Sequence, residues 1–415
     1  MKHILLSICL LIATSMTGQF ITQTQSPRLT AIQIIQEADN LLRTGRTQEA
    51  LLAYTSAINM DYSFAEAYMK RARLYQLLGQ TYEAMKDYDR ALELNPYSEY
   101  VFDQRAKLRM MAMDYKGALE DLDQAIAIAP ENNEIRAVRV DDYMALGEYE
   151  SALADIDTLI ARGFQVEHEY EKQALIRFLQ GDYIDAEQSI EMALEVNPYS
   201  SIAHDVQGLI HLKRQDYEQA IAAFTRAITF NAQFALAYYN RAVAYHYAGD
   251  RDKAIADLNS AMEIRKELPN VYFARAIIKK EMGDMEGALE DYEQAHLADS
   301  SFTQALYNRA YTYQLMGDYS NAMRDAQQII AQDDDSAEYW NLKGNIHLLF
   351  GEYNEAIEAY TTALRNDMDY MESRYNRGMA YIMSYRPIQG CIDLEISLEN
   401  GYEKAKDAIR YFCGY

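Results

Sequence analysis

A motif of 34 residues recurs along almost the whole sequence and constrains the fold more than any other feature. The stretch Leu236–Met262, LAYYNRAVAYHYAGDRDKAIADLNSAM, returns with variation ten more times. Counted from Ala31, eleven repeats extend to Lys404, starting at residues 31, 65, 99, 133, 167, 201, 235, 269, 303, 337 and 371. One small residue per repeat marks this register: Ala50, Ala84, Ala118, Ala152, Ala186, Ala220, Ala254, Ala288, Ala322, Ala356 and Gly390. We therefore expect one elongated array rather than several globular domains.

Each repeat contains two stretches of apolar residues with helical spacing, at positions 2–14 and 17–30. We call the two predicted helices A and B. Position 15, in the turn between them, is glycine in eight repeats: Gly45, Gly79, Gly147, Gly181, Gly249, Gly283, Gly317 and Gly351. Glycine adopts the left-handed backbone that closes a helix without a steric penalty. The sequence therefore predicts a helical hairpin in every repeat.

Small residues recur at positions 8, 20 and 27, where two helices would approach closely. Position 24 is aromatic at Tyr54, Tyr88, Phe224, Tyr292 and Tyr360, and position 32 is proline at Pro96, Pro130 and Pro198. Over residues 31–404 this pattern resembles the tetratricopeptide repeat (TPR) family. The resemblance implies an all-α fold, a right-handed superhelical α-solenoid of about eleven 34-residue helix-turn-helix repeats. The amphipathic residues 402–415 are expected to form a capping helix and tail.

Arginine at position 7 and aspartate at position 23 occur together in the same seven repeats. The pairs are Arg71 and Asp87, Arg105 and Asp121, Arg139 and Asp155, Arg241 and Asp257, Arg275 and Asp291, Arg309 and Asp325, and Arg377 and Asp393. Both positions lie eight residues from the turn, so an antiparallel hairpin places them side by side. We interpret them as structural ion pairs between helices A and B. The alternative is a ladder of arginines that bind an anionic ligand.

Aromatic and amide side chains gather at positions 5 and 6 of repeats 7 to 11. They are Tyr239, Asn240, Phe273, Tyr307, Asn308, Asn341, Tyr375 and Asn376. The TPR resemblance implies that positions 2, 5, 6 and 9 line a concave face. An amide both donates and accepts hydrogen bonds, so these asparagines could hold the backbone of an extended peptide. Equally, the aromatics could pack between successive A helices while the amides are solvated.

Catalytic and metal-binding patterns are missing from the sequence. It has no phosphate-binding glycine loop, no nucleophile motif and no cluster of Cys and His with ligand spacing. It also lacks the carboxylate clamp of one TPR subclass, since Phe273 and Ile277 stand where lysine and asparagine are needed. We therefore expect no enzyme activity, no cofactor and no metal. The formal charge of −24 disfavours nucleic acid and anionic membranes as partners.

The N-terminus is typical of a secretory signal peptide at residues 1–18, because a short positive end precedes the apolar run Ile4–Ala13. That run is about half the ~20 residues that a spanning helix needs. Residues 19–30 are expected to form a flexible entry segment. Cys391 and Cys413 remain after cleavage. In an exported protein they could form a disulfide or stay as two buried thiols.

These features predict an exported bacterial protein, periplasmic or at the cell surface. Its expected role is a non-catalytic scaffold of the cell envelope that binds a protein or an extended peptide. One alternative is an accessory tethering subunit of an envelope secretion or assembly machine, or of an enzyme complex. Another is a secreted or surface adhesion or virulence factor. The sequence leaves the partner and the oligomeric state open.

Overall fold

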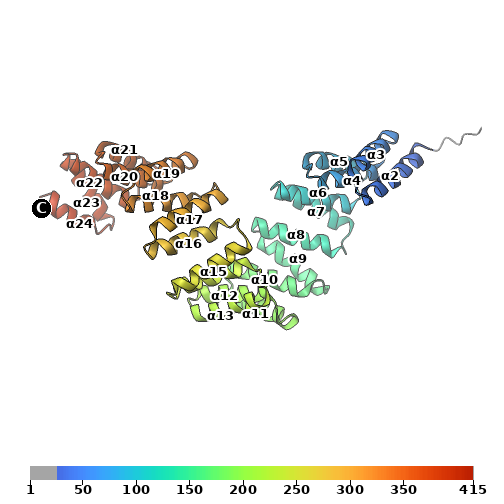
Figure 1. Cartoon of the computed structure of the whole chain (residues 1–415), viewed down its shortest axis with the longest axis horizontal. Helices are drawn as coiled ribbons and strands as arrows, with labels where there is room; N and C mark the ends of the chain where they lie inside the picture. The colour runs from blue at the N-terminus through green and yellow to red at the C-terminus, as the bar shows by residue number, and fades with distance from the viewer. Residues whose placement is uncertain (1–25, 415) are drawn as a thin grey trace, which may run out of the picture. The chain divides into compact units, whose positions relative to one another are not determined.

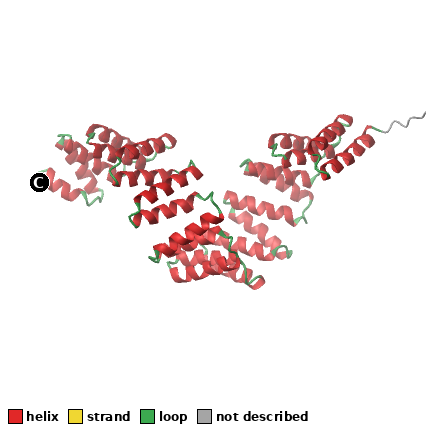
Figure 2. Ribbon diagram, in the orientation of Figure 1, coloured by secondary structure: helices red, strands yellow, loops and turns green. Residues whose placement is uncertain are grey.

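A computed structural model describes residues 26–414, so the predicted signal peptide lies outside the described residues. All regular structure within 26–414 is helical, in 23 helices labelled α2 to α24, and that range contains no strand (Figure 2). The predicted all-α class is confirmed. The even-numbered helices α2–α22 are helix A of repeats 1–11, and the odd-numbered α3–α23 are helix B.

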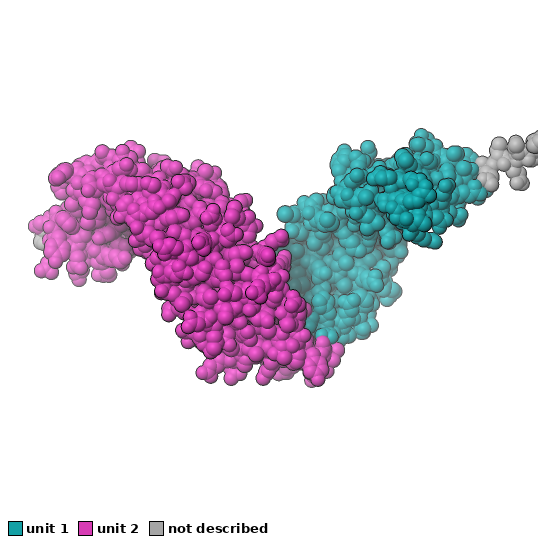
Figure 3. Space-filling view, viewed as in Figure 1, with its two compact units in different colours: residues 1–176 teal, residues 177–415 magenta. Residues whose placement is uncertain are grey.

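The chain divides into two compact parts at Ile176 and Arg177 (Figure 3). In the N-terminal part, consecutive helices pack on one another (Figure 1). They are α2 (Pro27–Arg43), α3 (Thr47–Met60), α4 (Ala65–Leu77), α5 (Thr81–Leu94), α6 (Glu99–Met111), α7 (Tyr115–Ile128), α8 (Asn133–Leu146), α9 (Tyr149–Ala161) and the first residues of α10 (Val166–Gln180).

The C-terminal part continues the same alternation of helices A and B. Its helices are α11 (Tyr183–Val196), α12 (Ser201–Lys213), α13 (Tyr217–Phe230), α14 (Ala235–Tyr247), α15 (Arg251–Ile264), α16 (Pro269–Glu281), α17 (Met285–Ala298), α18 (Thr303–Leu315), α19 (Tyr319–Gln332), α20 (Ala337–Phe350), α21 (Tyr353–Asn366), α22 (Met371–Met383), α23 (Pro387–Glu399) and α24 (Ala405–Phe412).

The first helix begins earlier than the sequence suggested. α2 starts at Pro27, within the segment expected to be a flexible entry. The Ser26 side chain caps the helix by accepting a hydrogen bond from the Leu29 N–H, and proline occupies the first helical turn. Proline suits this place because its missing N–H would have no partner there. The expectation of flexibility is therefore wrong for residues 27–30.

The turn at position 15 is left-handed in all eleven repeats, including those without glycine. Gly249 has a φ of 86°, as the sequence predicted for such a turn. Met113, Gln215 and Tyr385 occupy the same position in the other three repeats, with φ values of 60°, 64° and 62°. Such residues pay a steric cost in this conformation. The packing of the two helices therefore dictates the turn, whichever residue stands in it.

Close packing at positions 8 and 24 holds each hairpin together. A Cβ atom built on Gly208 of α12 would lie 2.5 Å from the Phe224 ring of α13. Gly344 has the same relation to the Tyr360 ring, again at 2.5 Å. Both rings are fully buried. The small residue at position 8 therefore makes room for the large one at position 24.

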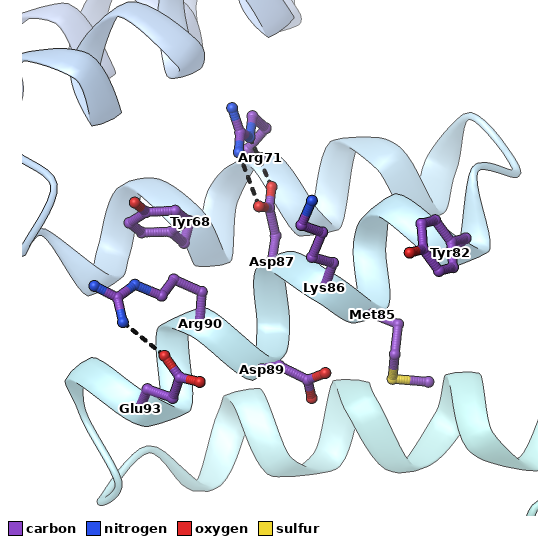
Figure 4. A pocket seen from close by; sticks show the side chains of 9 residues that line it. All are labelled: Tyr68, Arg71, Tyr82, Met85, Lys86, Asp87, Asp89, Arg90 and Glu93. Carbon is purple, nitrogen blue, oxygen red and sulfur yellow. Dashed lines mark hydrogen bonds and ion pairs between the residues drawn. The ribbon is translucent and has the colours of Figure 1, made fainter.

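The structure brings together all seven predicted arginine–aspartate pairs. In repeat 7 the Arg241 guanidinium donates two hydrogen bonds to the Asp257 carboxylate, both at 2.7 Å. Figure 4 shows the equivalent bonds from Arg71 to Asp87. The seven aspartates are between 2% and 6% exposed. Each pair joins helix A to helix B with a two-pronged charge-assisted contact, the strong form of this interaction.

The same arginines also reach the preceding repeat, which the sequence analysis missed. Arg241 donates a further bond from Nη1 to the Thr225 hydroxyl of α13, at 3.0 Å. Five others donate in the same way to position 25 of the repeat before, namely Arg71 to Thr55, Arg105 to Asp89, Arg139 to Asp123, Arg275 to Asn259 and Arg377 to Thr361. We call this arrangement the arginine staple. One side chain in each of these repeats thus connects three helices.

The last helix closes the array. Ala405 and Ala408 of α24 pack on Leu394 of α23, which buries all three side chains. Cys391 and Cys413 form a disulfide between α23 and the end of α24, with Cα atoms 5.7 Å apart. Of the two alternatives left open by the sequence, the structure shows the bridge.

Removing one staple should destabilise the protein. Arg241→Ala leaves the Asp257 carboxylate buried without its partner, so we expect a loss of about 3 kcal/mol in the free energy of unfolding of the surrounding repeats. Denaturant unfolding followed by circular dichroism measures it. Arg226→Ala is the matched control, because Arg226 on α13 is exposed and has no ion-pair partner among residues 26–414. Equal stability of the two variants would contradict the structural role of the pair.

Candidate functional site

The predicted aromatic contacts pack against side chains of their own repeat or of the next repeat in the C-terminal part. The ring centroids of Phe273 and Phe302 lie 5.1 Å apart, and those of Tyr375 and Tyr402 lie 5.3 Å apart. Tyr307 faces Tyr339 at 6.0 Å. Tyr239 is half-buried and packs on the core around Leu258 and Val271. These four side chains therefore serve helix packing and keep only part of their surface for a partner.

Two of the predicted amide contacts are corrected by the structure. Asn240 is 6% exposed, and its Nδ2 donates to both Asp205 carboxylate oxygens at 3.1 and 3.2 Å. Asn341 is 4% exposed, and its Oδ1 accepts from Asn376 at 3.3 Å. A buried amide that already has protein partners cannot hold a peptide backbone. Asn240 and Asn341 were therefore wrong as peptide contacts, because they face the neighbouring A helix.

The other two amides are half-buried but also have partners. The Asn308 side chain donates to the Gln304 carbonyl of its own helix at 3.0 Å. Asn376 donates to Asn345 at 3.0 Å as well as to Asn341. Both amides keep part of their surface in solvent, but each is already hydrogen-bonded within the protein. A ladder of free asparagines does not exist in the described part of the chain.

A group of partly or fully exposed tyrosines and glutamates lies on or beside the A helices of repeats 9 to 11. It comprises Tyr307, Glu338, Tyr370, Glu372, Tyr375 and Tyr402, which we call the tyrosine–carboxylate cluster. The two glutamates are exposed, and neither has an ion-pair partner among residues 26–414. Both occupy position 2, one of the four positions that the TPR resemblance places on the concave face. Their position in the repeat could therefore have identified these two glutamates from the sequence.

The phenols of this cluster lie in the field of the two glutamates. Burial raises the pKa of Tyr370 to about 12, with Glu372 and Glu338 adding to the effect. Burial and the nearby Glu338 also raise the pKa of Tyr307. Burial and the charge of Glu372 also raise the pKa of Tyr402. The two carboxylates and the tyrosine rings together give the cluster a negative, aromatic surface. Such a surface attracts cations through charge and through the ring faces.

A pocket of about 600 Å³ on the N-terminal part lies beside the staple of repeat 2. Figure 4 shows Arg71 directed at Asp87 and Arg90 directed at Glu93. Arg71 also donates to Thr55 at 3.1 Å. The charges on its wall are thus largely paired within the protein. This disfavours the alternative in which the position-7 arginines bind an anionic ligand.

Two further features limit the chemistry. Among residues 26–414 no group of three or more His, Cys, Asp or Glu side chains could hold a metal ion. None of the helices described in that range is both long enough and apolar enough to cross a membrane.

Family models for this repeat match several stretches of the chain. Models described as tetratricopeptide repeat match residues 65–98, 235–268, 269–300 and 307–371, and a model described as TPR repeat matches residues 208–249. The chain is a tetratricopeptide repeat protein. The TPR fold is in general a non-catalytic scaffold for protein–protein interaction.

Solved structures of similar fold include several TPR proteins. A tetratricopeptide repeat protein from Parabacteroides merdae is 19% identical, over 68% of this chain and 99% of that one, with a TM-score of 0.44. Yeast Tom70 is 14% identical, over 93% and 95% of the two chains, with a TM-score of 0.43. YrrB, a TPR protein with an unusual peptide-binding site, is 18% identical, over 46% of this chain and 99% of its own, with a TM-score of 0.39. No curated protein sequence matches this TPR protein.

Asp205 makes the stability of this TPR protein depend on pH. Burial raises the pKa of Asp205 to about 7 from its ordinary 3.8, although the bond from Asn240 works in the opposite direction. Because the folded pKa is raised, the neutral carboxyl contributes stability below about pH 4, and this is lost as pH rises through about 7. Asp205→Asn keeps an acceptor for Asn240 but cannot ionise. We therefore expect the melting temperature of the variant minus that of wild type to be larger at about pH 7 than at about pH 4.

Thermal unfolding of both proteins at the two pH values measures this difference. Comparing variant with wild type removes the contribution of other titrating groups, including the buried Asp142, whose pKa burial also raises to about 7. A melting-temperature difference that is the same at both pH values would show that Asp205 does not titrate in this range.

Proposed function

We propose that this TPR protein is a non-catalytic scaffold that binds a protein or extended peptide carrying basic residues, through the tyrosine–carboxylate cluster on α18 to α24. The observation that carries the proposal is the pair of exposed glutamates, Glu338 and Glu372, which have no ion-pair partner within residues 26–414 and are set among partly accessible tyrosines. A carboxylate and a ring face together suit a lysine or arginine side chain.

The charge of the whole chain supports a basic partner. Acidic residues outnumber basic ones by 63 to 39. A net negative protein accelerates its encounter with a positive partner and repels an acidic one. The tyrosines then supply contact area at a low cost in side-chain entropy.

We also propose that the protein is exported and acts in the bacterial cell envelope. The pattern of residues 1–18 supports this proposal. So does the Cys391–Cys413 disulfide, because disulfides persist in oxidising compartments outside the cytosol.

Reversing the charge of the cluster tests the proposed function. The probe is a set of short labelled peptides of matched composition that carry lysine, glutamine or glutamate at alternating positions. We expect wild type to bind the lysine series best, with binding that weakens as salt is added. Glu338→Lys with Glu372→Lys should lower the affinity for that series by about tenfold or more. Fluorescence anisotropy reads out binding.

The matched control changes two exposed glutamates elsewhere in the C-terminal part, Glu263→Lys with Glu399→Lys. It alters net charge by the same amount, so it separates a local contact from general electrostatics. If the control lost as much affinity as the cluster variant, or if both bound like wild type, the cluster would not be the binding surface.

A further inference from the structure

A second surface, in the N-terminal part, has the opposite charge. A pocket of about 330 Å³ lies between α2 and α4, with Tyr54 of α3 at its base. Arg43, Lys70 and Arg73 bring positive charge to its wall, and Asp39 is the one carboxylate there. We call it the basic pocket. Its net positive charge contrasts with the formal −24 of the chain.

The single carboxylate of the basic pocket is already occupied. Asp39 accepts a hydrogen bond from the Tyr54 hydroxyl at 2.6 Å and another from Lys70 Nζ at 2.8 Å. Burial opposes its ionisation, but these two bonds outweigh burial and hold the pKa of Asp39 below its ordinary value. It therefore stays charged and pairs directly with Lys70, while the charge of Arg43 also acts on it from outside ion-pair distance.

The two arginines have no direct ion-pair partner. Arg43 and Arg73 are exposed, and neither forms an ion pair within residues 26–414. This distinguishes them from the staple arginines, each of which is half-buried against an aspartate. In a chain with 63 acidic residues, two arginines beside one cavity with no carboxylate within ion-pair distance mark a place for an anion from outside. A guanidinium binds a carboxylate with two parallel bonds, which adds geometric selection to charge.

Part of the lining of the pocket is apolar and exposed. Leu77 is 70% exposed, and Leu42 beside it is half-buried. A small inorganic anion would leave these side chains in water. A ligand that places an apolar group beside its carboxylate would cover them and gain from burying that surface.

We propose that the basic pocket binds an acidic segment of a protein partner, with an Asp or Glu side chain between Arg43 and Arg73 and a neighbouring apolar side chain on Leu42 and Leu77. This goes beyond the proposed function, because the tyrosine–carboxylate cluster selects basic residues and the basic pocket selects acidic ones. The scaffold thus carries two recognition surfaces of opposite preference, one in each part of the chain.

The test uses the full chain and a short labelled peptide of alternating leucine and glutamate, acetylated at its N-terminus and amidated at its C-terminus. With both ends blocked, the only carboxylates are those of side chains. We expect binding by fluorescence anisotropy, and a loss of about tenfold or more in affinity for Arg43→Ala with Arg73→Ala. The control, Arg226→Ala with Arg365→Ala, removes two exposed arginines from the C-terminal part and should bind like wild type.

Four outcomes would overturn the proposal. Failure of wild type to bind, or retention of affinity by the Arg43 and Arg73 variant, would overturn it. Binding only when the C-terminus is left free would also overturn it, because the ligand would then be a chain end. Inorganic phosphate that competes as well as the peptide would show a pocket for a simple anion. Glu338→Lys with Glu372→Lys should leave the acidic peptide bound, so failure of the proposed function is separable from failure of this inference.

Discussion

The arginine at position 7 is the interaction on which the array depends. Its Nε and Nη2 atoms bind a buried aspartate across the hairpin, and its Nη1 reaches the B helix before it, as Arg241 does with Asp257 and Thr225. A planar group with five donors can serve two neighbours at fixed angles, which lysine cannot do. In a solenoid each repeat contacts only its neighbours, so stability is a sum of repeat and interface terms. The staple contributes to both terms at once.

In repeats 5 and 6 glutamine stands in the place of the arginine. In repeat 5, Gln173 donates to Asp157 of the preceding repeat at 3.1 Å, in the place of the inter-repeat bond. Its own hairpin offers Ser189 rather than aspartate at position 23. In repeat 6 the Gln207 Oε1 is buried without a hydrogen-bond partner. A buried acceptor left unpaired costs free energy. Repeats 5 and 6 are therefore two adjacent repeats in which the arginine–aspartate pair is replaced by other residues.

Much of the fold could be predicted from the sequence because its causes are local and repeated. The hairpin follows from apolar spacing and from glycine at position 15, and the ion pairs follow from residues that vary together. The bond to position 25 was harder to foresee, since Thr55, Asp89 and Asn259 share only the ability to accept. The left-handed turn at Met113 could not be read from residue type at all, because packing overrides local preference there.

The candidate site was only partly predictable, for a reason that lies in packing. Position 6 was assigned to the concave face, but whether an amide there meets solvent depends on the neighbouring A helix. Asp205 and Asn345 supply partners that bury or occupy Asn240 and Asn376. The carboxylates at position 2 could be recognised as a candidate site only from the structure, which shows the tyrosine rings around them. A charged side chain without an ion pair, as at Glu338 and at Arg43, proved more informative than residue type.

Hydrogen–deuterium exchange of wild type and of Arg241→Ala tests the central role of the staple most directly. Exchange reports the free energy of local opening, which falls where a contact between neighbouring elements is lost. Our account predicts that amides of α13, α14 and α15, the three helices that Arg241 connects, exchange faster in the variant than in wild type. Equal protection of these helices in the two proteins would contradict it.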